Sequence, residues 1–206
     1  MPILVLDIGG VFYRGWPDAA FWDRWTVRTG LDRATLEDAL SRSPEHRAAQ
    51  VGAMTADEAF AASGARLGLS GALFRQLAED AYLSEFNERL AQAVRGLRAL
   101  RVRVMALTNT LSSESQIMAR PEFAGVFEGV VSSRDVGFAK PAPGIYLALL
   151  ERLRAPPGDV VFVDDLPGHV EAARTLGLIG IRFEDTDQAL AELGAYFPEI
   201  AASSRR

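Results

Sequence analysis

The chain has 206 residues, of which 49% are hydrophobic and 24% are charged, and its formal net charge is −5. This length and composition are ordinary for one soluble globular domain, or for a domain that carries a small insert. The negative charge argues against a general nucleic-acid-binding protein, because no excess of Lys and Arg is available to neutralise phosphates. The sequence has no cysteine, which excludes disulfides, thiolate nucleophiles and cysteine-ligated metals.

No targeting or membrane-spanning segment is predicted. The apolar run from Met1 to Leu6 is short, has no basic leader and ends at Asp7, so it does not resemble a signal peptide. No stretch of the sequence reaches the length that a membrane span needs. We therefore expect a cytoplasmic protein with no membrane or nucleic-acid partner, present as a monomer or a homodimer.

Short apolar runs rich in Val, Ile and Leu predict five strands. They are Ile3–Leu6, Val102–Leu107, Val126–Val131, Val160–Val163 and Leu178–Phe183. Most of them are continuous rather than alternating, which is typical of strands buried on both faces of a parallel sheet.

Helical patterns lie between these runs. Apolar residues recur every three or four positions at Phe86, Leu90, Val94 and Leu97, at Ile145, Leu149 and Leu153, and at Val170, Ala173 and Leu176. Strands that alternate with helices predict an α/β fold with a doubly wound, Rossmann-like parallel sheet and right-handed crossovers. In such sheets, ligands bind beyond the carboxyl ends of the strands.

The segment between the first two predicted strands, from Trp16 to about Leu83, shows helical signals and no convincing strand. The signals are an N-cap at Asp18 before Phe21, Trp22 and Trp25, a capping box at Thr55–Glu58, and an apolar stripe at Leu73, Leu77 and Ala81. We interpret residues 16–83 as an α-helical cap inserted into a core formed by residues 1–15 and 84–206.

Polar features follow the predicted strands. Asp7 ends the first strand before Gly9 and Gly10, where a tight turn can bring backbone amides close to an anion or can be turn chemistry alone. Thr108 and Asn109 follow the second strand. They can hold phosphate oxygens or simply cap a helix.

Two further features follow later strands. Lys140 lies in a loop with Pro141 and Pro143, where it can be a point charge for a phosphate or merely a solvated side chain. Asp164 and Asp165 end the fourth strand. Crowding two carboxylates there is costly unless a cation compensates, and Mg²⁺ needs only one or two protein carboxylates. The alternative is an acidic pair that caps the next helix.

The order of these features along the chain resembles the four-motif pattern of the haloacid-dehalogenase-like hydrolases. The resemblance covers the whole chain, and the predicted cap lies where that family carries its helical cap. The segments that carry it are Asp7-Ile-Gly-Gly-Val11, Lys140-Pro-Ala-Pro-Gly-Ile-Tyr146 and Phe162–Gly177.

The resemblance implies a Mg²⁺-dependent phosphatase that acts on a small phosphorylated substrate through an aspartyl-phosphate. Asp7 is then the nucleophile. Mg²⁺ is expected between the carboxylates of Asp7 and Asp164 and the carbonyl of Gly9, with Asp165 coordinating directly or through water. The groups expected to hold the substrate are the amides of Ile8 and Gly9, and Thr108, Asn109 and Lys140, with Tyr13, Arg14 and Trp16 within reach.

Gly9 departs from the family pattern, because phosphatases of the family usually have a general acid, Asp, at this position. Losing a general acid–base typically costs about 10²–10⁴-fold in rate. A second departure is His169, near which many relatives have Asn, and which is expected to be structural. Two alternatives remain: a non-catalytic module that binds a phosphorylated metabolite or a partner protein, and a 2-haloacid dehalogenase, which needs neither a metal nor the missing Asp.

Overall fold

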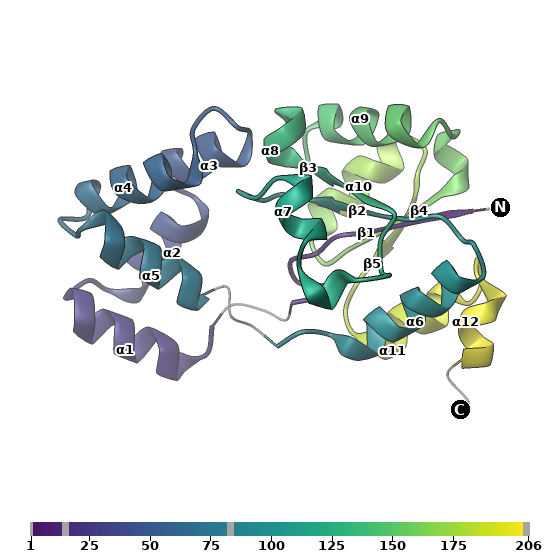
Figure 1. Cartoon of the computed structure of the whole chain (residues 1–206), viewed down its shortest axis with the longest axis horizontal. Coiled ribbons are helices and arrows are strands. Elements are labelled where there is room, and N and C mark those ends of the chain that lie inside the picture. The colour runs from purple at the N-terminus through teal and green to yellow at the C-terminus, as the bar shows by residue number, and fades with distance from the viewer. Residues whose placement is uncertain (1, 14–16, 82–84, 204–206) are drawn as a thin grey trace.

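The computed structural model describes residues 2–13, 17–81 and 85–203, without the side chains of residues 201–203. It consists of an α/β core and a group of helices that lies to one side of it (Figure 1). The boundaries expected for the cap, at Trp16 and Leu83, fall outside the described residues. Within these residues, no helix is both long enough and apolar enough to cross a membrane.

The core is built on a parallel sheet of five strands in the order β3-β2-β1-β4-β5, which confirms the predicted fold class. The strands are β1 (Ile3–Leu6), β2 (Val104–Thr108), β3 (Gly129–Ser132), β4 (Val160–Asp164) and β5 (Ile179–Arg182). Strand β1 is central, and its Leu6 is in register with Ala106 of β2 and Val163 of β4. The carboxyl ends of these three strands therefore meet at one edge of the sheet.

Two strands begin later than their apolar runs suggested, β2 at Val104 and β3 at Gly129. The apolar residues before them, Val102, Val126 and Phe127, are buried in the core without pairing in the sheet. An apolar run in the sequence indicates which residues are buried. It does not indicate where strand pairing begins.

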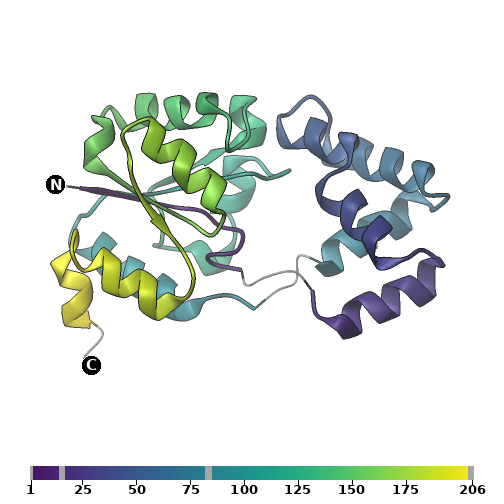
Figure 2. The same cartoon turned by 180° about the vertical axis from the view of Figure 1, so that it is seen from behind.

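Helices cover both faces of the sheet, as Figures 1 and 2 show. On one face, Leu4 and Leu6 pack in a cluster with Leu90 and Leu193; on the other, Val5 packs in a cluster that includes Leu149. The helices of the first face are α6 (Glu88–Ala99), α11 (Thr186–Leu193) and α12 (Pro198–Ser203). Those of the second are α9 (Pro143–Leu153) and α10 (Pro167–Thr175). Both faces of β1 are thus buried, which explains why its sequence is continuously apolar.

Shorter elements complete the core. They are α7 (Glu114–Met118), η1 (Pro121–Phe123), α8 (Ser133–Val136) and η2 (Pro157–Asp159).

In the described residues between β1 and α6, the chain forms helices that are called the cap helices here: α1 (Ala19–Thr29), α2 (Arg33–Ser41), α3 (Pro44–Gln50), α4 (Ala56–Arg66) and α5 (Gly71–Ala81). They have a separate hydrophobic cluster that includes Trp22, Trp25 and Leu77. The side chain of Asp18 caps α1, and the capping box predicted at Thr55 and Glu58 begins α4. Trp22 and Trp25 therefore belong to the hydrophobic core between the cap helices.

Candidate active site

The residues singled out from the sequence converge at the carboxyl edge of the sheet. Asp7 directly follows β1, Thr108 is the last residue of β2, and Asp164 is the last residue of β4. Because β1 lies between the other two strands, Asp7 is at the centre of this edge. The side chains of all three residues are buried.

Lys140 joins the carboxylates of two neighbouring strands. Its Nζ lies 2.9 Å from Oδ1 of Asp7 and 2.7 Å from Oδ2 of Asp164, and it also donates a 2.9 Å hydrogen bond to the carbonyl of Leu107. These three contacts use all the donors of an ammonium group. The Lys140 side chain is fully buried, so the ion pair is shielded from solvent.

This arrangement separates the proton affinities of the two carboxylates. Burial raises the pKa of Asp7 to about 6, against the lowering effect of Lys140. Burial also acts to raise the pKa of Asp164, but Lys140 and His169 outweigh it and hold that pKa well below its usual range. Burial acts to lower the pKa of Lys140, but the charges of Asp7 and Asp164 outweigh this effect and raise that pKa. The lysine therefore stays charged.

Asp7 is held through one carboxylate oxygen. Oδ1 accepts the contact from Lys140 and a 2.7 Å hydrogen bond from the backbone amide of Ile8. Among the described residues, none donates a hydrogen bond to Oδ2 of Asp7. One oxygen is thus anchored while the other is available for a reaction or a ligand.

Asn109 holds the backbone of Lys140. Its side chain donates a 2.8 Å hydrogen bond to the carbonyl of Lys140 and accepts a 2.7 Å hydrogen bond from the Lys140 amide. The neighbouring Thr108 hydroxyl has no hydrogen-bond partner in the described parts of the chain. Of this pair, Thr108 has a free polar group for a ligand, whereas Asn109 positions the lysine.

Asp165 lies against the loop that follows Asp7. A Cβ on Gly10 would lie 2.2 Å from Oδ2 of Asp165, so the carboxylate occupies the space that a side chain at position 10 needs. Burial, followed by the charge of Asp164, raises the pKa of Asp165. Gly9 differs from Gly10, because a Cβ there would meet no atom within 4 Å.

His169 contacts Asp164, a relationship that the sequence did not predict. Its Nδ1 lies 3.0 and 3.1 Å from the two carboxylate oxygens of Asp164, and Oδ1 of Asp164 also accepts a 2.9 Å hydrogen bond from the amide of Leu166. Ligand atoms of Asp7, Asp164 and His169 all lie within 4.8 Å of one another. The only sequence signal for this contact is the position of His169 in the first turn of α10, just after β4.

Of the residues expected to reach the substrate, Tyr13 has other partners. Its hydroxyl donates a 2.5 Å hydrogen bond to Glu122 and accepts one of 3.3 Å from Arg120. Arg14 and Trp16 lie outside the described residues.

The family model for haloacid dehalogenase-like hydrolases matches residues 3–177. The chain belongs to this family. The match spans β1 to α10 and includes every strand end described above. Membership establishes a hydrolase scaffold. The roles of individual residues rest on the geometry.

Two curated relatives are similar to part of the chain. Bifunctional epoxide hydrolase 2 of Sus scrofa is 37% identical over 123 residues, which are 55% of this chain and 22% of that protein. The phosphorylated carbohydrates phosphatase of Thermotoga maritima is 32% identical over 114 residues, or 53% of each chain. The matched segment thus spans about a fifth of the pig protein and about half of the Thermotoga protein.

The fold is shared with the HAD-family enzyme bt-2542 of Bacteroides thetaiotaomicron, solved in complex with magnesium and inorganic phosphate. The TM-score is 0.75 at 18% identity, over 92% of this chain and 98% of that chain. At this identity the likeness shows the fold alone.

Proposed function

We propose that the chain is a Mg²⁺-dependent phosphatase that hydrolyses a small phosphorylated metabolite through an aspartyl-phosphate on Asp7. The observation that carries this proposal is the buried Asp7 carboxylate at the end of the central strand. Its Oδ1 is anchored by Lys140 and Ile8, whereas its Oδ2 has no partner in the described part of the chain. A carboxylate held in this way is oriented for attack through Oδ2. The phosphatase activity of the Thermotoga relative supports the same chemistry. The bt-2542 enzyme, which shares the fold, was solved with magnesium bound.

The site fits a hard divalent cation. Asp7, Asp164 and Asp165 supply three carboxylates, and Lys140 is one compensating cation among them. A second cation with a preference for oxygen ligands would balance this charge. When bound, Mg²⁺ supplies positive charge that stabilises the charge developing on the transferred phosphoryl group.

The two adjacent aspartates have different surroundings, and we assign them different roles. The oxygens of Asp164 already accept from Lys140, His169 and the Leu166 amide. The carboxylate of Asp165 lies against Gly10 and, within the described residues, accepts no hydrogen bond from another residue's side chain. Asp165, with Asp7 and the carbonyl of Gly9, would therefore hold the metal. The expectation from the sequence was Asp164 as a ligand and Asp165 coordinating directly or through water. Asp164 remains the alternative ligand, because its ligand atom lies within 4.8 Å of one on Asp7.

The protein's own groups would hold the substrate. Lys140 keeps Asp7 oriented, and it compensates negative charge beside the phosphoryl group as that group arrives. The Thr108 hydroxyl and the backbone amide of Gly9 have no hydrogen-bond partner among the described residues, so both are available for the phosphoryl oxygens. The amides of Ile8 and Gly10 already donate to Asp7 and to the Tyr13 carbonyl. Arg14, expected to reach the substrate, remains a candidate contact outside the described residues.

Gly9 sets the kind of phosphate ester that suits this site. Without a carboxyl group at position 9, no acid is placed there to protonate the leaving oxygen. A leaving group that departs readily as an anion, such as a phenolate or a carboxylate, loses least from this change. Aryl and acyl phosphates should therefore be hydrolysed more readily than alkyl phosphates.

Two other functions remain as alternatives. A non-catalytic module that binds a phosphorylated metabolite would explain Gly9, but the Asp7–Lys140–Asp164 arrangement is kept intact and buried. A 2-haloacid dehalogenase would not need the acidic pair at the end of β4. Release of halide from a 2-haloacid without Mg²⁺ would favour that activity.

The proposal is tested by hydrolysis of p-nitrophenyl phosphate, whose leaving group departs without an acid. Turnover should require Mg²⁺ and should disappear with EDTA and in Asp7→Asn. Hydrolysis that stays at the Asp7→Asn background would contradict the proposal and favour the non-catalytic module.

A further inference from the structure

The cap helices meet the core at a close backbone contact. Gly52, in the turn between α3 and α4, has φ +72°, and a Cβ there would lie 2.5 Å from the carbonyl oxygen of Arg134 in α8. Both the left-handed conformation and the approach of Arg134 favour glycine at this position. Helices α3 and α8 also lie beside each other in Figure 1.

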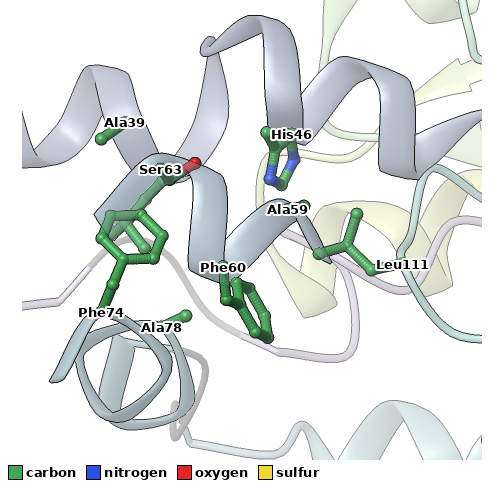
Figure 3. Close-up of a pocket in the computed structure, with 9 residues that line it drawn as sticks. Ala39, His46, Ala59, Phe60, Ser63, Phe74, Ala78 and Leu111 are labelled. Atoms are coloured by element: carbon green, nitrogen blue, oxygen red, sulfur yellow. The ribbon is translucent and has the colours of Figure 1, made fainter. Parts of the chain in front are cut away.

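Leu111, in the core loop after β2, also lies at the junction with the cap helices. Leu111 lines a small pocket whose other walls are cap residues, among them His46, Ala59 and Phe60 (Figure 3). Burial lowers the pKa of His46 to about 4, so its ring is neutral and compatible with an apolar neighbour. The core thus presents an apolar side chain to the surface of the cap helices.

The core segments that receive these contacts are hydrogen-bonded to each other. Ser133, at the start of α8, accepts a 3.0 Å hydrogen bond from the amide of Thr110 and donates one of 3.3 Å to the Thr110 carbonyl. The hydroxyl of Ser132 donates a 2.7 Å hydrogen bond to the carbonyl of Ser112. Residues 110–112 and the start of α8 therefore form one hydrogen-bonded unit that faces the cap helices. This unit is called the docking platform.

The docking platform continues into the active site. Asn109 immediately precedes it, and the Asn109 side chain bonds both the amide and the carbonyl of Lys140. Lys140 in turn bridges Asp7 and Asp164. An unbroken series of contacts therefore runs from the cap helices to the nucleophile.

We propose that Leu111 and Gly52 are positioning residues, through which docking of the cap helices holds Lys140 in place between Asp7 and Asp164. When the cap helices are docked, the platform is confined and Asn109 keeps both hydrogen bonds to the lysine backbone. When they are released, the Asn109–Lys140 contacts open more often. The inference depends on the proposed function only for what Lys140 does in catalysis.

The test measures hydrogen exchange of the Lys140 amide, which donates to Asn109, by NMR on the full chain without substrate. Leu111→Ala removes the apolar side chain that lines the pocket at the junction, and Gly52→Ala disturbs the backbone approach. Each should accelerate exchange at Lys140 by at least about fivefold, while exchange at Val163 in β4 changes by less than about twofold. The comparison with Val163 separates local release of Lys140 from a general loss of stability.

Matched controls are available for both variants. Leu147→Ala truncates a leucine that is 54% exposed on α9, and Gly68→Ala imposes the same backbone strain at φ +71° with no atom within 4 Å of the added Cβ. Neither control should accelerate exchange at Lys140 by more than about twofold. Unchanged exchange in both Leu111→Ala and Gly52→Ala would overturn the proposal, and so would equal acceleration in the controls.

A kinetic readout complements exchange. With p-nitrophenyl phosphate, Leu111→Ala and Gly52→Ala should lower kcat with little change in KM, because Lys140 acts on the nucleophile. If the wild-type chain proves inactive, the proposed function fails, whereas the exchange result still decides whether docking holds Lys140.

Discussion

The carboxylate of Asp165 occupies the space that a side chain on Gly10 would need. A Cβ on Gly10 would overlap Oδ2 of Asp165. Gly10 also has φ +74°, a conformation that residues with a side chain rarely adopt. A glycine at this position therefore lets the chain turn after Asp7 and lets Asp165 approach that turn. The two adjacent glycines therefore differ. Gly10 is required because Asp165 fills the space of a side chain, whereas position 9 has room for one.

Gly10→Ala should weaken Mg²⁺ binding by about 10–100-fold, because the methyl group displaces Asp165 from the loop after Asp7. Isothermal titration with Mg²⁺ measures this. Gly30→Ala is the control, since Gly30 has φ +71° and no atom within 4 Å of an added Cβ. Equal Mg²⁺ affinity in Gly10→Ala and wild type would show that Asp165 does not hold the metal.

The roles assigned to the adjacent aspartates make a second prediction. Asp165→Asn should weaken Mg²⁺ binding by at least about tenfold, whereas Asp164→Asn should change it by less than about threefold. Asp164→Asn should instead lower kcat, because Lys140 loses a charged partner at 2.7 Å. The opposite order of Mg²⁺ affinities would restore Asp164 as the direct ligand.

Gly9→Asp should raise the hydrolysis of alkyl phosphates by at least about tenfold, since it restores a carboxyl group that can protonate the leaving oxygen. The structure has room for this change, because a Cβ at position 9 meets no atom within 4 Å. Hydrolysis of p-nitrophenyl phosphate should change much less.

Gly9→Asn is the matched control for this substitution, because it adds similar bulk without an acid. If Gly9→Asp brings no gain with alkyl phosphates, a missing carboxyl group is not the main limit on turnover. An equal gain in Gly9→Asn would point to an effect of bulk.

The buried Asp7 carboxylate predicts a pH-dependent change in stability. Its pKa in the folded, metal-free protein is about 6, above the ordinary value of 3.8. Its contribution to stability is therefore fully present below about pH 4 and is lost as the pH rises through about 6. In EDTA at about pH 7.5, Asp7→Asn should be more stable than wild type by about 1–3 kcal/mol, because no charge is buried at this position.

Urea denaturation at about pH 7.5 and at about pH 4 measures this difference, which should disappear at the lower pH. A wild-type chain that is the more stable of the two at the higher pH would show that Lys140 outweighs the burial of Asp7.

Much of the fold could be predicted from the sequence, because strands buried on both faces are continuously apolar. The capping box at Thr55 was also visible, since its residues are close in sequence. The start of β2 could not be predicted. Val102 is buried like a strand residue, although it does not pair with a neighbouring strand. Burial determines the pattern, whereas pairing depends on neighbours that the pattern does not identify.

The site was predictable as a set of residues and less so as a set of contacts. Asp7, Thr108 and Asp164 follow from their places at strand ends. The bonds from Asn109 to Lys140, which is 31 positions away, have no local signature. The different surroundings of Asp164 and Asp165 likewise depend on tertiary neighbours, because the two residues are the same type and adjacent.

Trapping the phosphorylated form of Asp7 would show whether Asp7 is the nucleophile. The enzyme is quenched with acid during turnover of p-nitrophenyl phosphate, reduced with borohydride and sequenced by mass spectrometry. Reduction of an acyl phosphate converts the aspartate to homoserine, so homoserine is expected at position 7 of the wild-type chain and not in Asp7→Asn. Hydrolysis that continues without homoserine at position 7, and that survives in Asp7→Asn, would show that Asp7 is not the nucleophile.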